Sequence, residues 1–521
     1  MTKESVFRLA PPKKKGLLSL VFSRFLIIAL LLIWQVSLIV GFYGWLDDYF
    51  TYFSACVGLF SLAMVIYLFN SRMDSTAKLT WMLILSVMPL PGAILLWFTQ
   101  TNAGHRLITH RVEELIGETK TAIPQDARVL DALAEDDSGT DDLSTYLNRS
   151  GCFPICDRTE ARYFPLGEEK FAAMLEELKQ AEKFIFMEYF IVEEGYMWGE
   201  ILKILVEKAE AGVDVRVMYD GMCEMSTLPA DYCKLLAQHG IKAKAFSPIR
   251  PFISSHYNYP DHRKILVIDG KVAFNGGVNL ADEYINHIER FGHWKDTALM
   301  LKGPAVRSFT LLFLQMWNID EKEPDFSPVT AEAPEYPDAQ GYIMPYSDCP
   351  LDEDKVGEAV YMDILNRAND YVYIMSPYLI LDGELETSLK FAAQRGIDVR
   401  LILPGIPDKK MAYALAKSHY ASLLGAGVKI YEYTPGFVHA KVFVSDDCKA
   451  VVGTINLDYR SLYHHFECAT YLYRTPCIAD IHADFLATQE KCRQVTPESI
   501  RHEKAYYKIV GTLMKFIAPL M

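Results

Sequence analysis

The chain has 521 residues, of which 51% are hydrophobic, and its mean hydropathy is +0.07. This length allows about two or three domains, and the hydropathy is high for a soluble protein and low for a transporter. The formal net charge of −14 argues against a nucleic-acid partner, because phosphate backbones are normally bound by basic faces.

Three uncharged apolar stretches predict a membrane anchor in residues 1–100. Residues 25–46, 50–69 and 79–99 are each about as long as a helix that crosses a bilayer. The third stretch contains two prolines, which a membrane helix tolerates with a kink. We therefore expect about three transmembrane helices, with two spans and one interfacial segment as the alternative.

The basic residues around these stretches predict an orientation. Lys13, Lys14, Lys15 and Arg24 precede the first stretch, and basic residues are enriched on the cytoplasmic side of membrane proteins. Three spans then place the N-terminus in the cytoplasm and the remainder of the chain on the outer face, whereas two spans reverse this. We expect a multi-pass protein of a cell membrane.

Residues 101–150 are polar and form the next predicted segment. Asp136, Asp137, Asp141 and Asp142 surround a Ser-Gly pair in this segment. A charged stretch of this kind is typical of a solvated linker, and we interpret the segment in that way.

The order of predicted strands and helices then occurs twice. In residues 151–335, a strand at 184–191 is followed by an amphipathic helix and a second strand. Residues 336–500 repeat this order, beginning with a strand at 371–375. The repeat predicts an α/β fold of two duplicated halves, each a mixed sheet flanked by helices. A shared site is expected where the two halves meet.

Residues 501–521 predict a C-terminal amphipathic helix, because apolar residues alternate with lysines at helical spacing. The helix is expected either at a membrane interface or against the protein's own core.

The two halves carry two copies of one motif. Each copy has a histidine, a lysine two positions later and an aspartate after four more residues, and then a pair of small residues and an asparagine at identical offsets. The first copy is His262, Lys264, Asp269, Gly276, Gly277 and Asn279, and the second is His439, Lys441, Asp446, Gly453, Thr454 and Asn456.

These side chains suit phosphodiester exchange. One neutral imidazole can attack phosphorus while a second, protonated imidazole donates to the leaving alkoxide. Each histidine shares a strand face with the lysine two positions on, and the lysines and asparagines offer donors to the phosphoryl oxygens. The glycines allow close approach. Asp269 and Asp446 are interpreted as residues that fix a turn and form local ion pairs away from the substrate.

No metal and no cofactor are expected at these positions. The motifs contain no clustered carboxylates, and the ten cysteines lack the spacing of a zinc site.

The paired H-x-K-x4-D motifs resemble those of the phospholipase D superfamily. Residues 258–264, 276–284 and 456–461 are similar to blocks of its bacterial cardiolipin synthases, while Gly277 and Thr454 stand where the superfamily often has serine. The resemblance implies that two phosphatidylglycerol molecules in the membrane give cardiolipin and glycerol through a phosphatidyl-histidine. By analogy, His262 is the nucleophile and His439 the acid and base. The alternatives are a membrane-bound phospholipase D, a transferase with another phospholipid donor, and a non-enzymatic scaffold.

The resemblance also implies that a downstream carboxylate orients each catalytic histidine. Glu467 is the candidate for His439 and Asp296 is the candidate for His262, and ordinary carboxylates at strand ends are the alternative. Other histidines near the motifs are interpreted as surface or supporting groups rather than headgroup contacts: His256, His293, His464 and His465.

Overall fold

The computed structural model describes residues 7–10, 47–71, 73–100, 106–136, 138–246 and 259–520, and the isolated positions 33, 36, 37, 40 and 41. The chain divides into two compact units. The larger comprises Met1–Pro12, Leu107–Ile249 and Tyr259–Lys515, and the smaller comprises Lys13–Arg106, Arg250–Asn258 and Phe516–Met521.

The smaller unit contains helices α3 (Asp47–Phe69), α4 (Ser75–Val87) and α5 (Pro89–Gln100). Of the described helices, only Thr51–Phe69 has the length and composition of a membrane span, and it is 6% buried. The stretch 79–99 is not one helix, because Met88 leaves the helical conformation (φ −134°, ψ 71°) ahead of a proline. The first predicted span falls almost entirely outside the described residues, so the expected anchor of three spans is not shown.

The segment 101–150 is not the solvated linker that its acidic residues suggested. From residue 106 it forms α6 (Arg106–Thr119), α7 (Ala127–Ala134) and α8 (Thr140–Ser150), whose apolar residues are buried in the larger unit. Asp136 forms an ion pair with Arg474 at 2.8 Å and accepts a hydrogen bond from the Tyr473 hydroxyl. The acidic residue therefore has a partner in the second half of the chain, which a solvated linker would not need.

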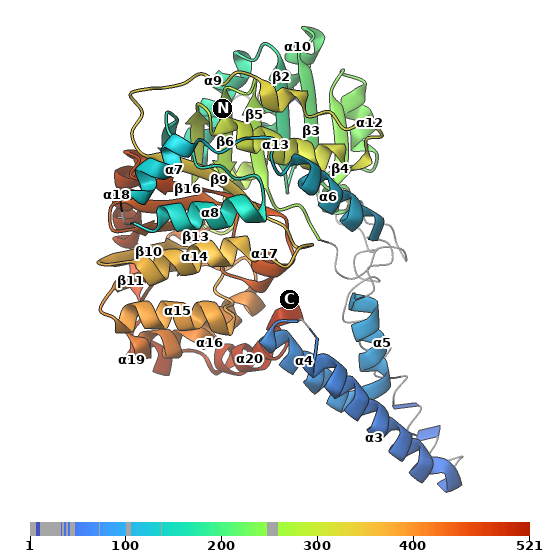
Figure 1. The fold of residues 1–521 in the computed structure, drawn as a ribbon. Helices are drawn as coiled ribbons and strands as arrows, with labels where there is room; N and C mark the ends of the chain where they lie inside the picture. The colour runs from blue at the N-terminus through green and yellow to red at the C-terminus, as the bar shows by residue number, and fades with distance from the viewer. Residues whose placement is uncertain are drawn as a thin grey trace. The chain divides into compact units, whose positions relative to one another are not determined.

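The first half is built on a seven-stranded mixed sheet (Figure 1). Three of its strands are parallel and the motif strand β5 begins the antiparallel part. The strand order is β1 (Glu160–Phe164), β8 (Ala298–Lys302), β6 (Val272–Gly276), β5 (Lys264–Ile268), β2 (Phe184–Tyr189), β3 (Asp214–Asp220) and β4 (Lys242–Phe246). Its helices are α9 (Gly167–Lys179), α10 (Tyr196–Glu210), α11 (Met222–Ser226), α12 (Tyr232–Ala237) and α13 (Val306–Trp317).

The second half repeats this sheet strand for strand and adds one edge strand. Its order is β9 (Tyr342–Asp348), β16 (Glu467–Tyr473), β15 (Lys449–Gly453), β14 (Val442–Ser445), β10 (Tyr371–Met375), β11 (Asp398–Pro404), β12 (Lys429–Tyr433) and β17 (Cys492–Gln494). Its helices are α14 (Val356–Arg367), α15 (Gly383–Gln394), α16 (Lys410–Ala426), α17 (Tyr459–Tyr463), α18 (Cys477–Gln489), α19 (Pro497–Arg501) and α20 (Ala505–Lys515). The two sheets confirm the expected pair of mixed α/β halves.

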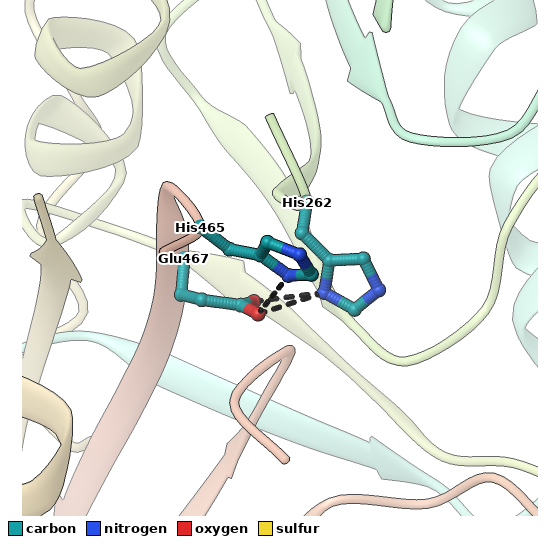
Figure 2. Close-up of side chains that lie close together, drawn as sticks. All are labelled: His262, His465 and Glu467. Carbon is teal, nitrogen blue, oxygen red and sulfur yellow. Dashed lines mark hydrogen bonds and ion pairs between the residues drawn. The ribbon is translucent and has the colours of Figure 1, made fainter. Parts of the chain in front are cut away.

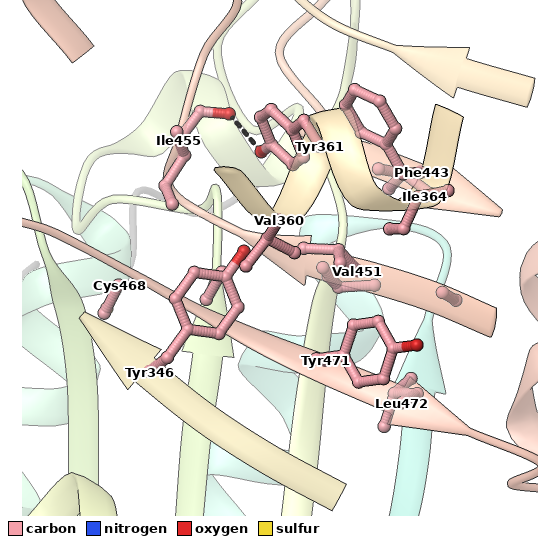
Figure 3. Close-up of a cluster of buried hydrophobic side chains, with 14 of the residues drawn as sticks. Tyr346, Val360, Tyr361, Ile364, Phe443, Val451, Ile455, Cys468, Tyr471 and Leu472 are labelled. Atoms are coloured by element: carbon pink, nitrogen blue, oxygen red, sulfur yellow. Dashed lines mark hydrogen bonds between the residues drawn. The ribbon is translucent and has the colours of Figure 1, made fainter. Parts of the chain in front are cut away.

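The core of the second half holds its motif strand in place. Tyr361 of α14 stacks on Phe443 of β14, with ring centroids 3.9 Å apart and planes 11° apart, and its hydroxyl donates to the Ile455 carbonyl at 2.8 Å (Figure 3). Offset stacking of this kind adds about 1 kcal/mol to the burial of the two rings. The helix, the motif strand and the turn after β15 are thus fastened to one another.

The two halves share one hydrophobic core and a small sheet. Buried residues of both large sheets belong to the same cluster, and β7 (His293–Lys295) pairs in parallel with β13 (Gly436–Val438). Helix α18 reaches across as well, because Asp484 accepts from the Tyr163 hydroxyl and pairs with Lys295, both at 2.7 Å. The halves are therefore held in a fixed relation to each other.

The motif aspartates fasten the start of the neighbouring strand. Asp269 accepts hydrogen bonds from the backbone N–H groups of Glu182, Lys183 and Phe184 at 2.7–2.9 Å. Asp446 accepts from residues 369–371 in the same way. Asp269 has φ +55° in the tight turn between β5 and β6. The partners are backbone amides in place of the expected ion-pair partners, and neither aspartate forms an ion pair with a described residue. That the two aspartates lie away from the substrate stays a prediction.

Replacing Asp269 by alanine should destabilise the larger unit, since three backbone donors lose a charged acceptor. We expect the free energy of unfolding to fall by about 3 kcal/mol, measured by urea denaturation in detergent. Asp338→Ala is the matched control because Asp338 is exposed. Equal unfolding midpoints for the two variants would contradict this account of the turn.

Candidate active site

The two motif histidines lie where the halves meet, and each is fastened to the opposite half. The backbone N–H of His262 donates to the Phe466 carbonyl at 2.9 Å, and that of His439 donates to the Lys295 carbonyl at 2.7 Å. Both residues are more than nine-tenths buried. Both histidines are therefore held at the interface between the two halves.

The carboxylates that orient these histidines are exchanged between the halves. His262 Nδ1 lies 2.9 Å from both carboxylate oxygens of Glu467, and His439 Nδ1 lies 2.6 Å from Asp296. The expected pairing, Glu467 with His439 and Asp296 with His262, is therefore wrong. The backbone contacts explain the exchange, because each carboxylate directly follows the residue whose carbonyl binds the histidine of the other half.

The pKa values of the two carboxylates are shifted in opposite directions. Burial raises the pKa of Glu467 well above its usual value, although the charge of Lys264 and the hydroxyls of Ser461 and Thr454 oppose this. Burial acts in the same direction on Asp296, but the charge and hydrogen bond of His439 outweigh it and hold the pKa of Asp296 below its usual value. The anionic form is thus favoured more strongly at Asp296 than at Glu467.

Both imidazoles are neutral near pH 7 in the absence of a bound anion. Burial, followed by the charges of Lys264 and other cations, holds the pKa of His262 well below its usual value. Burial and Lys441 lower the pKa of His439 to about 4, although Asp296 opposes them. A neutral imidazole has a free nitrogen lone pair, which a nucleophile or a general base requires.

The motif lysines are buried beside the histidines. Lys264 Nζ donates to the His262 carbonyl at 2.6 Å, and Lys441 Nζ donates to the His439 carbonyl. Burial lowers the pKa of Lys264 to about 8 and that of Lys441 to about 7. An anionic phosphoryl group between them would favour their charged forms, so the site is suited to a phosphodiester.

The small residues of the motifs allow close approach within the protein. A Cβ on Gly277 would lie 2.1 Å from Asp296 Oδ1, and a Cβ on Gly276, at φ +149°, would lie 2.5 Å from the Ala298 Cα. Gly453 similarly contacts β16. Thr454, at the position of Gly277, donates its hydroxyl to Glu467. Substrate contact by these four residues remains a prediction.

The two motif asparagines differ in their partners. Asn279 donates to the Tyr284 hydroxyl at 2.8 Å and accepts from the Ile191 N–H at 3.1 Å, so its amide is used within the protein. Asn456 Oδ1 is buried and has no hydrogen-bond partner among the described residues. Of the two, Asn456 remains the candidate for substrate contact.

Two buried residues near the site were not singled out from the sequence. His465 was interpreted as a surface or supporting histidine, but its ring is 8% exposed and lies 5.2 Å from that of His262 (Figure 2). Lys170 of α9 is fully buried, lies 3.3 Å from the Val278 carbonyl, and has its pKa lowered to about 7 by burial. The sequence offered one indication that His465 lies near the site, namely its position two residues before Glu467.

Known protein families and individual proteins resemble this chain in sequence. A family profile described as "Cardiolipin synthase, PLD-like domain" matches residues 174–317 and 361–488. A protein of Streptococcus mutans is 57% identical over 88% of this chain and 100% of its own length. A cardiolipin synthase of Halalkalibacterium halodurans is 32% identical over 92% of this chain and 95% of its own length.

A solved structure has the same fold. The crystal structure of phosphatidylserine synthase from Haemophilus influenzae Rd KW20 covers 73% of this chain and 97% of its own chain, with a TM-score of 0.54. Its sequence identity of 15% limits this likeness to the fold.

Replacing Lys441 by methionine should stabilise the protein and slow its reaction. Removing an ammonium group whose pKa is lowered to about 7 by burial relieves the desolvation penalty of its charged form, and loss of a phosphoryl donor costs about 100-fold in rate. The gain should shrink between pH 7 and 9.5. Above the folded pKa of about 7 the folded lysine is neutral while the unfolded lysine stays protonated up to about 10.5, so the wild type gains stability as pH rises through this window. Thermal unfolding and turnover at both pH values measure these effects.

The matched control for this substitution is Lys322→Met, which removes an exposed lysine. It should change neither stability nor rate. A destabilised Lys441→Met protein would contradict the inferred cost of burying this ammonium group.

Proposed function

The chain belongs to the cardiolipin synthases of the phospholipase D superfamily, and on that basis we propose that it joins two phosphatidylglycerol molecules into cardiolipin and glycerol. It is a phosphatidyltransferase. The observation that carries the proposal is that each motif imidazole contacts a carboxylate of the opposite half, which holds both histidines at one interface. A nucleophile and an acid on one phosphorus atom are what phosphatidyl transfer requires.

The first step forms a covalent intermediate. The bound phosphodiester anion favours the protonated form of His439. The Nε2 lone pair of His262 attacks phosphorus, the bond from phosphorus to the glycerol oxygen breaks, and this protonated His439 gives its proton to the departing glycerol. Lys264 and Lys441 neutralise the charge on the non-bridging oxygens. The product of this step is phosphatidyl-His262 and a neutral His439.

The second step consumes the intermediate. Neutral His439 takes the proton from a hydroxyl of the second phosphatidylglycerol, whose oxygen attacks phosphorus and releases His262. Cardiolipin forms, and His439 again carries the proton that the next leaving group needs. Transfer prevails over hydrolysis because an anchored site meets its lipid acceptor at high local concentration.

The unequal carboxylates support this division of roles. Asp296 has its pKa held below the usual value, so a full negative charge stabilises the imidazolium form of His439. Glu467 has a raised pKa, so it favours the imidazolium form of His262 less strongly. His262 is accordingly the better nucleophile and His439 the better proton carrier.

Membrane attachment belongs to the same proposal. The apolar helix at Thr51–Phe69 supports at least one span. We propose that the apolar stretches on either side of it complete a multi-pass anchor in a bacterial cell membrane. With three spans, the catalytic halves lie on the outer face. Attachment brings the site to the layer in which its substrate is dissolved.

The C-terminal helix α20 has one face for the protein and one for a lipid surface. Gly511 and Met514 are buried, and a Cβ on Gly511 would lie 2.3 Å from the Ala414 carbonyl of α16. Tyr506, Ile509 and Leu513 are more than half exposed. The helix thus packs on the core, which is one of the two alternatives predicted from the sequence. Its exposed face is suited to a lipid surface.

Purified full-length protein should convert labelled phosphatidylglycerol to cardiolipin and glycerol in equal amounts. His262→Ala and His439→Ala should each lower the rate by about 10³-fold or more, while His110→Ala, at an exposed position, should leave it unchanged. Peptide mapping of wild-type protein quenched during turnover should locate the phosphatidyl group on His262.

Other outcomes of this experiment separate the alternatives. Release of phosphatidate without cardiolipin would replace the proposal by a hydrolase. Turnover with phosphatidylethanolamine in place of phosphatidylglycerol would change the donor, and an adduct on His439 would reverse the two roles.

A tryptophan at position 513 should report contact of α20 with lipid. In liposomes that contain phosphatidylglycerol and brominated lipid, Leu513→Trp should add fluorescence that bromine quenches, because bromine quenches only at close range. Phe391→Trp, at an exposed position on α15, is the matched control and should add unquenched fluorescence. Equal quenching at both positions would contradict a lipid contact specific to α20.

A further inference from the structure

Three potential metal ligands converge beside the proposed nucleophile. The side chains of His262, His465 and Glu467 each offer an atom, and these atoms lie within 4.8 Å of one another. The Nδ1 atoms of the two imidazoles lie 2.9 Å and 3.4 Å from the carboxylate oxygens of Glu467 (Figure 2). All three side chains are buried. Two imidazoles and one carboxylate are a ligand set typical of zinc.

The His465 imidazole is buried next to the proposed nucleophile. Its ring is 8% exposed, and neither ring nitrogen has a hydrogen-bond partner among the described residues. The 3.4 Å approach to Glu467 is an ion-pair distance that lacks hydrogen-bond geometry. A buried polar group without a partner is costly, and the proposed transfer steps do not use this imidazole. Its free nitrogen lone pair is available to a metal ion.

The distances suit a tetrahedral ion. Zinc bonds of about 2.0–2.1 Å place neighbouring ligand atoms roughly 3.3 Å apart, close to the two approaches to Glu467. The carboxylate is already oriented, because Thr454 and Ser461 donate their hydroxyls to its two oxygens, and such outer partners strengthen a metal site. We propose that His262, His465 and Glu467 form an inhibitory site for a zinc-type divalent cation, with water as the fourth ligand.

Inhibition, which rests on the proposed function, follows from proton placement on His262. A metal bound at Nδ1 occupies that lone pair and displaces the hydrogen bond to Glu467. The single proton of the neutral ring must then reside on Nε2, and any further proton passes to water. A protonated Nε2 cannot attack phosphorus. The ammonium group of Lys264, beside His262, opposes a bound cation and makes the binding reversible.

Equilibrium dialysis of the full-length protein in detergent against zinc alone tests the site. Chelator-treated wild-type protein should bind one zinc ion per chain at this site, and His465→Asn should bind it about 10-fold more weakly or worse, since an inner ligand matters at least as much as an outer one. His110→Asn is the matched control, since it removes an exposed histidine. Wild-type affinity in His465→Asn would overturn the site.

A second measurement needs no variant. The described cysteines are all free and are the chemical rivals for zinc. The X-ray absorption spectrum of zinc on the wild-type protein should show nitrogen and oxygen neighbours with two imidazoles, whereas a sulfur shell or absence of binding would overturn the proposal.

Turnover separates inhibition from binding. Zinc should slow phosphatidylglycerol conversion by the wild type, chelator should restore it, and His465→Asn should need about 10-fold more zinc for half inhibition. Zinc bound at the histidines without loss of turnover would overturn inhibition. Zinc binding in a protein that never makes cardiolipin would instead refute the proposed function while leaving the site intact.

Discussion

The exchange of carboxylates between the two halves is the constraint on which the site depends. Each histidine is fastened by its backbone N–H to one strand end of the other half, and the next residue along that strand end supplies the carboxylate for its ring. A histidine cannot hold its orientation unless the opposite half is correctly docked. The shared core and the β7–β13 pair supply that docking. The catalytic histidines are therefore correctly oriented only when the interface between the two halves is intact.

The site also concentrates positive charge where the protein is least able to solvate it. Lys170, Lys264 and Lys441 are all fully or almost fully buried, and burial lowers the pKa of each. An anionic phosphodiester favours the charged forms of these lysines by adding negative charge to that of Asp296. Burying these ammonium groups costs electrostatic free energy, and a bound phosphodiester offsets part of that cost. Such a region is expected to be less stable than an apolar core of the same size.

Features carried by local spacing could be predicted from the sequence, and features carried by the interface could not. The motif copies and the repeated alternation of strands and helices along the chain were evident because a duplicated chain repeats its spacing. The sequence prediction assigned Glu467 and Asp296 to the wrong histidines, because spacing along one half carries no information about contacts with the other half. Asp136 was assigned to a linker because its partner Arg474 is more than 300 residues away in the sequence. His465 had no periodic pattern to mark it as buried.

The difference between Gly277 and Thr454 has a consequence for how the two active halves can diverge. In a symmetric dimer of single repeats, every substitution would alter both imidazole–carboxylate pairs together. A fused chain can change one pair alone, and here one pair has threonine and glutamate while the other has glycine and aspartate. Specialised proton affinities at two related positions thus become accessible to selection once the repeats are covalently linked. Fusion is what permits a division of labour between two inherited copies of one motif.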